Sequence, residues 1–511
     1  MSATVSGRAG AAGGDGFAAS RAGFDRLVDF LDGAEAARLA HAELETQLDT
    51  RGRQLLRQLF QDHVDVRAHR EQRLGEVTDA DGVPRPHVEA GHERALTTVF
   101  GEVDVRRLAY RARGQTNLHP ADAGLNLPAE KHSHGLRRLA AVEATRGSFD
   151  DAAEAIERGT GVVLGKRQVE ELTSRAAVDF EDFYTRRQPA PGESTDVLAI
   201  SVDGKGIVMR ADALRPATAK AAESSTSKLK TRLSKGEKRN RKRLAEVGAV
   251  YDTKPVPRTS ADILAGSDDT TDDRDQPEPA APAAANKWLT ASVADTAATV
   301  IATVFDEADR RDPTHQRTRI ALVDGNNHQI DRVAAESQAR GITVPVLVDF
   351  IHVLEYLWKA AWSFHDEADP ATEQWVHDKA VAVLDGNART VAAGIRRLAT
   401  RRKLDPRERT GADTCADYLT AKAPYLDYPT ALQAGWPIAT GVIEGACRHL
   451  VKDRMDITGA RWGLDGAEAI LKLRALRSNG DLDEYWRYHL EQERRRVHQT
   501  RYRDGIIPQA A

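Results

Sequence analysis

Three acidic residues lie where carboxylates from separate elements could meet. Asp203 and Asp324 each follow an apolar run and precede a glycine, in 196-DVLAISVDGK-205 and 318-TRIALVDGNN-327. Each run is typical of a buried strand, so we expect both aspartates at strand carboxyl ends, where open α/β sheets bind ligands. Glu444 lies in 440-TGVIEGACRHLVKDR-454, whose apolar spacing predicts a helix with one packed face. The three carboxylates can therefore converge on one point.

Carboxylates in such a group would bind a hard divalent cation, Mg²⁺ or Mn²⁺. Two such ions roughly 3.5–4 Å apart can clamp the attacking and leaving oxygens of a phosphodiester displacement. The alternative is structural, because the chain has 77 Asp and Glu residues and an Asp-Gly pair after a strand is commonly a turn. The residues alone leave both interpretations open.

A further predicted strand, 341-GITVPVLV-348, leads directly into Asp349 and His352. Asp349 is well placed to cap the helix that follows. It also ends a strand, so it competes with Asp324 for the second acidic position.

These motifs, together with residues 98–128 and the 459-GARW-462 tract, resemble DDE transposases of bacterial insertion sequences. The likeness covers about residues 95–480 and is greatest to the ISKra group, related to Mutator-like and hAT-like elements. In that class a Cys- or Asp-x-x-His signature follows the second catalytic aspartate, which Asp349 and His352 match. The resemblance therefore implies that Asp203, Asp324 and Glu444 are the catalytic acids that hold two Mg²⁺ or Mn²⁺ ions. It also implies a cytoplasmic homo-oligomer that cleaves double-stranded DNA at terminal inverted repeats and joins it to target DNA.

Two other functions share some of these features. An RNase H-like nuclease or resolvase would have the same acids without a long DNA-binding region before them. A domesticated, non-catalytic DNA-binding protein would usually lack one acid, and all three are present here.

Composition indicates a globular chain of two or three domains, since 511 residues are 41% hydrophobic and 29% charged. Two cysteines are too few for a disulfide framework or a zinc site. The first residues lack an apolar signal region and no run approaches about 18 apolar residues, so we expect a cytoplasmic protein without membrane spans.

The expected organisation is a disordered tail (1–20), a mainly helical DNA-binding region (21–190), a catalytic domain (195–480), and a basic C-terminal helix and tail (481–511). The catalytic domain is expected to be an α/β core of RNase H-like fold with a mixed five-stranded sheet and flanking helices. Its strands are predicted at 196–203, 206–209, 246–251, 318–323 and 344–348, with a helix at 287–309. A disordered charged insert (212–286) and an all-helical insertion (350–440) would interrupt it. In the N-terminal region, residues 24–73 read as helix with a leucine stripe typical of a core or of a partner-helix surface.

Several basic residues are candidates to bind DNA despite the net charge of −4. Helices at 135–146, 148–158 and 166–184 predict either a helix-turn-helix at 148–184 or a plain three-helix bundle. In the first case Lys166, Arg167 and Gln168 would meet base edges. The basic run near residue 240 could contact phosphates or be a solvated helix face; it contains Lys238, Arg239, Arg241, Lys242 and Arg243. Lys452 and Arg454 could contact phosphates beyond Glu444, although Arg454 could equally form a surface ion pair.

Overall fold

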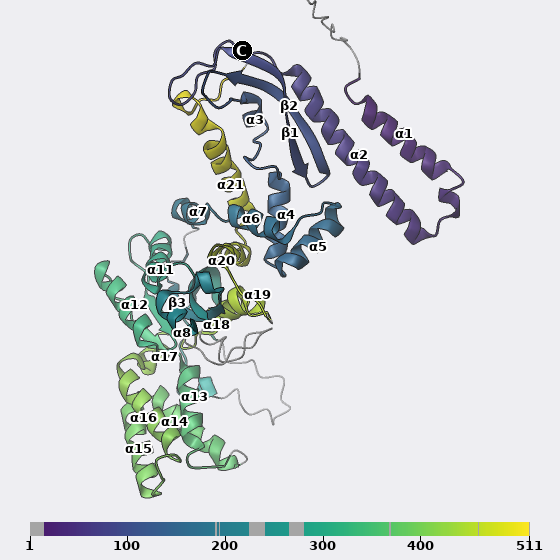
Figure 1. The fold of residues 1–511 in the computed structure, drawn as a ribbon. Coiled ribbons are helices and arrows are strands. Elements are labelled where there is room, and N and C mark those ends of the chain that lie inside the picture. The colour runs from purple at the N-terminus through teal and green to yellow at the C-terminus, as the bar shows by residue number, and fades with distance from the viewer. Residues whose placement is uncertain are drawn as a thin grey trace, which may run out of the picture. The chain divides into compact units, whose positions relative to one another are not determined.

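The computed structural model describes residues 15–189, 192–193, 195–223, 241–264, 281–366, 369–457 and 459–509. The chain forms two compact units (Figure 1). The N-terminal unit comprises Met1–Phe183 and Leu482–Ala511, and the sheet unit comprises Tyr184–Asp481. The C-terminal segment thus belongs to the same unit as the N-terminal helices. Within the described residues, no helix has the length and apolar character needed to cross a membrane.

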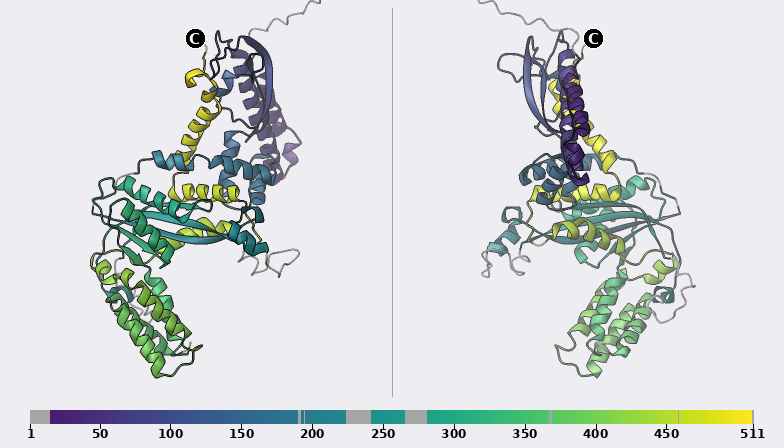
Figure 2. Two further views of the ribbon diagram at one scale, coloured as in Figure 1. Left: turned by 60° about the vertical axis from the view of Figure 1, so that its left-hand side comes forward. Right: turned by 90° about the vertical axis from the view of Figure 1, so that its right-hand side faces the viewer.

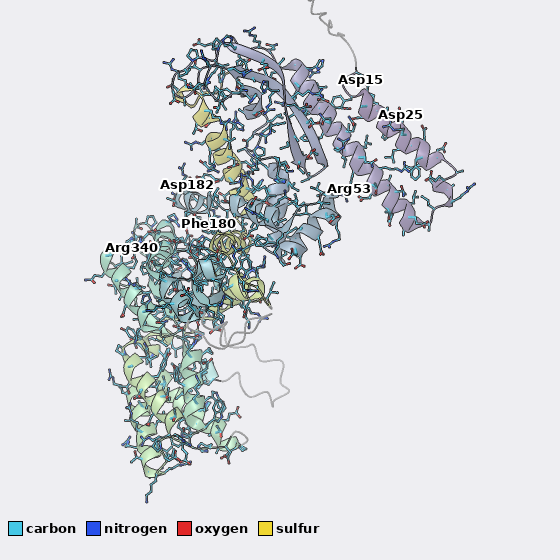
Figure 3. The ribbon with its side chains drawn as sticks, viewed as in Figure 1. Asp15, Asp25, Arg53, Phe180, Asp182 and Arg340 are labelled. Carbon is cyan, nitrogen blue, oxygen red and sulfur yellow. The ribbon has the colours of Figure 1, made fainter. Side chains whose placement is uncertain are left out.

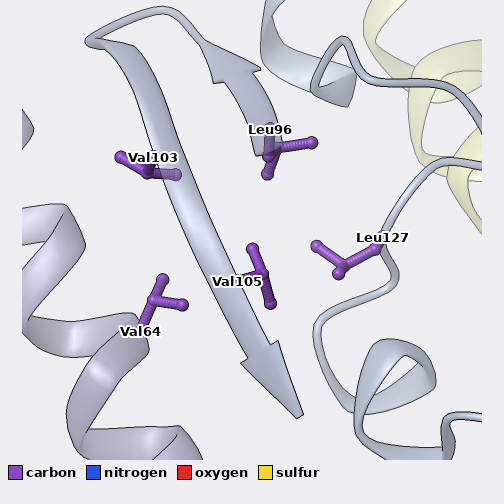
Figure 4. Packing of buried hydrophobic residues seen from close by; sticks show 5 residues of the cluster. All are labelled: Val64, Leu96, Val103, Val105 and Leu127. Carbon is purple, nitrogen blue, oxygen red and sulfur yellow. The ribbon is translucent and has the colours of Figure 1, made fainter. Parts of the chain in front are cut away.

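The N-terminal unit begins with two helices and a hairpin. Helix α1 (Ala18–Asp32), a 3-10 turn η1 (Ala36–Arg38) and α2 (His41–Arg70) replace the single helix predicted over 24–73, because the chain turns at Gly33. Strands β1 (His87–Thr98) and β2 (Gly101–Arg111) pair antiparallel as a hairpin. Figure 1 shows α2 between this hairpin and α1. Figure 4 shows the core between α2 and the hairpin, formed by Val64, Leu96, Val103, Val105 and Leu127.

The rest of the N-terminal unit is helical: α3 (Pro120–Gly124), α4 (His134–Ala144), α5 (Phe149–Thr160), α6 (Lys166–Ala176), α7 (Phe180–Arg186) and α21 (Leu482–Val497), followed by 3-10 turns η6 (Gln499–Arg501) and η7 (Arg503–Gly505). Ser148 caps α5 and Asp151 completes the capping box. Helix α21 is joined to this unit by ion pairs to Asp179, which lies 2.7 Å from His489 and 3.0 Å from Arg496. Burial opposes ionisation of Asp179, but these two partners lower its pKa to about 2. The C-terminal helix is therefore a structural part of the N-terminal unit.

The sheet unit contains a five-stranded mixed sheet, as predicted, with the order β5-β4-β3-β6-β7. Its strands are β3 (Val197–Val208), β4 (Lys242–Thr253), β5 (Ala284–Ser292), β6 (Arg319–Val323) and β7 (Val346–Val348). Strand β4 runs antiparallel to β3 and β5, whereas β3, β6 and β7 are parallel. The central strands β3 and β6 are buried along their apolar runs, as near-continuous hydrophobic strands of a covered sheet should be.

Three predictions about this unit were wrong in detail: they concern a strand, the start of a helix and a disordered segment. Residues 196–203 and 206–209 belong to one strand, β3, which pairs with β4 across Gly204 and Gly206. Residues 284–292, where the predicted helix was to begin, form edge strand β5, and α11 begins only at Ala297. Strand β4 contains the strand predicted at 246–251 and extends it within the segment 212–286 that was expected to be a disordered charged insert; residues 224–240 and 265–280 of that segment are outside the described part.

Helices complete the sheet unit: η2 (Ala211–Ala213), α8 (Pro216–Glu223), α10 (Ser260–Leu264), α11 (Ala297–Arg311), α12 (Asn327–Ala339), α13 (Phe350–Ala361), α14 (Pro370–Leu384), α15 (Ala388–Arg401), α16 (Thr410–Lys422), η4 (Ala423–Tyr425), α17 (Tyr428–Gln433), α18 (Gly441–Ala446), a π-helical turn η5 (Cys447–Lys452), α19 (Asp453–Met455) and α20 (Leu464–Asn479). Arg340, labelled in Figure 3, joins α12 to α11 through an ion pair of 2.7 Å with Asp306. Helices α13 to α16 form a bundle that projects away from the sheet (Figure 2). They occupy the stretch between Asp349 and Glu444.

Candidate functional site

Three aspartates align across neighbouring parallel strands of the sheet. Ser201 of β3 pairs with Leu322 of β6, and Val323 of β6 pairs with Val348 of β7. If the first pairing is continued by two residues, Asp203 lies beside Asp324. If the second is continued by one residue, Asp324 lies beside Asp349, so the three aspartates form one row on adjacent strands. Strands β6 and β7 end at this row, but β3 continues to Val208. The expectation that Asp203 ends its strand was therefore wrong, whereas Asp324 and Asp349 do follow strand ends.

Asp203 is held by both of its carboxylate oxygens. Oδ1 accepts the N–H of Gly204 at 2.6 Å, and Oδ2 accepts the thiol of Cys447 at 3.2 Å. Burial, reinforced by the charge of Asp203, raises the pKa of Cys447, so the thiol keeps its proton and remains a donor. This contact connects β3 to the π-helical turn that follows Glu444.

Glu444 lies in the first turn of α18 and is exposed to solvent. Directly after α18 the helix widens into the π-helical turn that begins at Cys447, a distortion that is frequent at functional sites. Cys447 is three residues after Glu444, so both project from about the same helix face. The contact between Cys447 and Asp203 thus brings the face that carries Glu444 to the aspartate row.

Asp324 begins a tight turn between β6 and α12. Its Oδ1 accepts the N–H of Asn326 at 2.8 Å, and its backbone carbonyl accepts the Tyr418 hydroxyl of α16 at 3.4 Å. The next residue, Gly325, has φ of +92°, and a Cβ there would lie 2.6 Å from the Tyr418 hydroxyl. Both the backbone conformation and the close approach require glycine at this position. The helical bundle therefore supports the loop that carries Asp324.

Asp349 is completely buried and makes several hydrogen bonds. Its Oδ1 accepts the N–H of Ile351 at 2.9 Å, which confirms that it caps α13. Its Oδ2 accepts the hydroxyl of Thr440 and lies 3.3 Å from Nδ1 of His352. Burial alone would raise the pKa of Asp349, but the hydrogen bonds from His352, Thr440 and Ile351 hold it below its ordinary value. Asp349 in turn raises the pKa of His352, which favours the imidazolium form of His352 beside this carboxylate.

Thr440 links Asp349 to Glu444. Its hydroxyl oxygen lies 3.4 Å from Oε1 of Glu444 as well as within hydrogen-bonding distance of Asp349. A hydroxyl has one proton, so it donates to one carboxylate at a time. Thr440 is 2% exposed and lies one turn before Glu444, so its hydroxyl can donate to Glu444 only when it does not donate to Asp349.

One group of side chains in the described sheet unit offers three ligand atoms within 4.8 Å of one another, and it consists of Asp349, His352 and Glu444. Carboxylates with an imidazole could hold a divalent metal ion. Among the described residues, the carboxylates of the predicted set, Asp203, Asp324 and Glu444, do not all lie within 4.8 Å of one another. Glu444 is thus the one predicted acid that belongs to the group, and the signature residues Asp349 and His352 complete it.

Sequence reasoning missed two charged residues beside the acids. Glu246 of β4 pairs opposite Gly204, and burial together with Asp203 raises its pKa. Lys422 at the end of α16 is 6% exposed and its ammonium contacts the side chain of Asn327; burial lowers its pKa while Asp324 opposes the shift. If the pairing of β4 with β3 had been known, it would have shown that Glu246 lies beside Asp203. Lys422 lies near Asp324 only because of the fold of the helical bundle, which the sequence does not reveal.

The predicted base-reading residues lie in the first turn of α6, as expected. Lys166 is exposed and lies 2.6 Å from Asp150, and Arg167 is exposed and lies 2.9 Å from Glu171. Gln168 Oε1 accepts the N–H of Gly165 and so caps its own helix. Helices α4, α5 and α6 pack against one another, an arrangement compatible with either a helix-turn-helix or a three-helix bundle.

The other predicted DNA contacts differ in their accessibility. Lys238 and Arg239 lie outside the described residues, and Arg241 is partly exposed just before β4. Lys242 and Lys452 are exposed. Arg243 donates to the carbonyls of Val293 at 2.7 Å and Ala294 at 3.1 Å. Its guanidinium is therefore engaged in hydrogen bonds within the chain instead of being free to contact a phosphate.

Arg454 is 2% exposed, and its guanidinium lies 4.6 Å from the centre of the Trp462 ring. Neither a phosphate contact nor a surface ion pair fits this burial. The prediction failed because sequence spacing does not reveal that the chain after α19 folds back over the arginine.

A scan against protein-family models finds no match to this chain, and a search of curated proteins finds no similar one.

Proposed function

We propose that this chain is a metal-dependent DNA phosphodiester-transfer enzyme of the DDE transposase type. It would cleave DNA at the ends of an insertion sequence and join the freed 3′-hydroxyl to target DNA. The observation that carries the proposal is the row of Asp203, Asp324 and Asp349 on adjacent strands, with the Glu444 helix attached to Asp203 through Cys447. Carboxylates from separate elements thus lie along one row of the sheet, and convergence of such carboxylates on two metal ions is what phosphoryl transfer would use.

The element order supports an RNase H-like fold for the sheet unit. Three strands, a helix, a strand, a helix, a strand and further helices follow one another as β3-β4-β5-α11-β6-α12-β7-α13. This is the order expected from the resemblance to transposases, and the helices α13 to α17 occupy the place of the expected helical insertion before Glu444. This agreement in element order supports the fold only. The proposed function rests on the acidic residues of the site.

We assign Asp324 as the second catalytic acid and Asp349 as a positioning residue. Asp349 is fully buried and its oxygens accept hydrogen bonds from Ile351, Thr440 and His352, which leaves little capacity for a metal ion that DNA can reach. Asp324 is partly exposed and at the end of its strand. Asp349 would instead hold Thr440 and His352, the two side chains that lie beside Glu444.

The donor set fits Mg²⁺ or Mn²⁺, because Asp203, Asp324 and Glu444 offer hard carboxylate oxygens. When bound, two such ions would polarise the scissile phosphodiester and activate the attacking hydroxyl. The chain's own residues would hold the three carboxylates in place: Gly204 and Cys447 for Asp203, Asn326 for Asp324, and Thr440 for Glu444. The acids must turn partly toward one another on metal binding, since they are not within 4.8 Å as a group.

The DNA partner would be double-stranded, with element ends and target both bound by a homo-oligomer. Lys242 and Lys452 are exposed on the sheet unit and remain candidate phosphate contacts, and the first turn of α6 with Lys166 and Arg167 remains a candidate for end recognition. Phosphate contacts would position the duplex and base contacts would select the element end.

The proposal is tested with purified full-length chain and a plasmid that carries the DNA flanking its coding sequence. We expect Mg²⁺- or Mn²⁺-dependent cleavage at a pair of inverted repeats, and joining of a pre-cleaved end to a second plasmid. Asp203→Asn and Glu444→Gln should each abolish both reactions and preserve duplex binding, while Asp378→Asn, an exposed aspartate on α14, should behave like the parent chain. Cleavage without joining would indicate a nuclease or resolvase, and full activity in either site variant would refute the site.

A further inference from the structure

An apolar face runs along the α1–α2 helix pair of the N-terminal unit. Of the fourteen large apolar side chains that are exposed in the described residues, six belong to this pair and are between 39% and 56% exposed: Phe24, Val28, Leu31, Leu48, Leu56 and Leu59. An open groove of about 640 Å³ between the two helices is lined by residues that include Phe17, Phe24, Asp25, Leu55 and Leu59. We call this surface the α1–α2 face.

The contacts between the two helices leave this face uncovered. Asp62 of α2 accepts both the N–H of Ser20 at 3.0 Å and its hydroxyl at 2.5 Å, and the Arg51 guanidinium lies 3.9 Å from the centre of the Phe30 ring. These contacts fix α1 on the side of α2 away from the β1–β2 hairpin (Figure 1). A concentration of exposed apolar side chains on one helix pair favours an interaction site.

We propose that the α1–α2 face binds the same face of a second copy of this chain, with the two α2 helices antiparallel. At their exposed fractions the six side chains present roughly 500 Å² of apolar surface, which is close to the apolar share of the roughly 800 Å² that each partner buries in a standard interface. A two-fold pairing makes the face its own complement.

Charge along α2 selects the antiparallel arrangement. Residues 41–50 contain Glu43, Glu45 and Asp49 and no lysine or arginine, whereas the last turn contains the exposed Arg67 and Arg70. A parallel pairing would oppose acid to acid, and an antiparallel pairing opposes acid to base.

The apolar and charged positions fit one register. With 100° per residue, Glu45, Leu56, Leu59 and Arg70 lie within an arc of about 60° on α2. An antiparallel pairing centred between Arg57 and Gln58 places Leu56 of one copy opposite Leu59 of the other. The same register places Glu45 of one copy opposite Arg70 of the other.

The first test is the mass of the full-length chain in solution, measured by light scattering after size exclusion over roughly 1–100 µM. We expect a dimer for the parent chain, and a monomer for the Leu56→Glu, Leu59→Glu double variant, with association weakened at least about a hundredfold. Val163→Glu, at a 73% exposed apolar residue before α6, is the matched control and should remain dimeric. A parent chain that is monomeric throughout, or a dimer that survives the leucine changes, would overturn the proposal.

A charge reversal decides the arrangement without altering apolar contacts. Glu45→Arg and Arg70→Glu should each weaken association by roughly tenfold, since each repels its counterpart twice in a two-fold dimer. The combined variant restores opposite charges and should recover the parent affinity. If the losses of affinity from the two single changes simply add up in the combined variant, the antiparallel register is refuted. Far-UV circular dichroism checks that each variant is folded.

Discussion

Replacing Asp349 with Asn should destabilise the sheet unit by more than the loss of a helix cap. Asn is as good an N-cap as Asp, so the hydrogen bond from the N–H of Ile351 should survive. The amide that replaces Oδ2 cannot accept the Thr440 hydroxyl or carry the charge that pairs with His352. The substitution therefore separates capping from the buried charge.

The expected loss is about 2–3 kcal/mol. Two hydrogen bonds end at Oδ2, and each bond to a charged group contributes roughly 1.5–3 kcal/mol. The amide nitrogen of Asn can donate to the Thr440 hydroxyl oxygen, so only the bond with His352 is lost without replacement. The full penalty of about 3–5 kcal/mol for breaking a buried ion pair does not apply, because the His352 side chain is 30% exposed and can release its proton. A residue that only capped α13 would lose at most about 1 kcal/mol in the same exchange.

Urea unfolding followed by tryptophan fluorescence measures this loss. Six of the seven tryptophans lie in the sheet unit, so fluorescence reports mainly on its unfolding. The matched control is Asp369→Asn, which also keeps a helix cap but at an exposed position, and it should change stability by less than about 0.5 kcal/mol.

The loss should also depend on pH. The lowered pKa of Asp349 gives stability that is present above about pH 4 and lost as pH falls through its folded value. The raised pKa of His352 gives stability that is full below about pH 6.5 and lost as pH rises through its folded value. The difference between parent and variant should therefore be largest near pH 5–6 and shrink above neutrality. A loss below about 1 kcal/mol at pH 6, or one that is constant to pH 9, would refute the role given to this ion pair.

Three further predictions concern the surroundings of the acids. Cys447→Ala should reduce cleavage at least tenfold while Cys447→Ser, which can still donate to Asp203, retains most of it; equal rates would contradict the positioning role, and single-turnover cleavage measures both. Gly325→Ala should cost about 1–3 kcal/mol in urea unfolding because of its positive φ and close contact, and an unchanged midpoint would contradict this. Lys452→Ala should reduce the log–log salt slope of duplex binding by roughly 0.9, whereas Arg454→Ala should lower stability by about 1–2 kcal/mol without changing that slope; the reverse pattern would contradict the burial of Arg454.

The sheet could be predicted in outline, but not the strands that build it. Gly204 and Gly206 read as a turn, yet they continue β3 because the side chains of Leu244 and Lys242 on the paired strand cover them. A Cβ at Gly204 would come within 2.9 Å of Leu244, so the glycines serve close packing between strands. Local propensity cannot reveal a requirement set by the neighbouring strand.

Strand β5 illustrates the same limit. Residues 284–292 contain alanines and a lysine that favour helix, but pairing with β4 holds them extended and buries Trp288. The acids were recognisable because each follows a local pattern in the sequence. Thr440, Cys447 and Glu246 were not, because their importance arises from contacts between segments up to 244 residues apart.

A thiolate substitution at Asp324 tests most directly whether this residue is a metal ligand of a DNA-cleaving centre. Cysteine binds Mn²⁺ better than Mg²⁺ because its sulfur is a softer ligand than a carboxylate oxygen. We predict that Asp324→Cys does not cleave element-end DNA in Mg²⁺ but recovers measurable cleavage in Mn²⁺, while Asp324→Asn cleaves with neither and both variants bind the duplex. Cleavage by Asp324→Asn at the parent rate in Mg²⁺ would contradict the account.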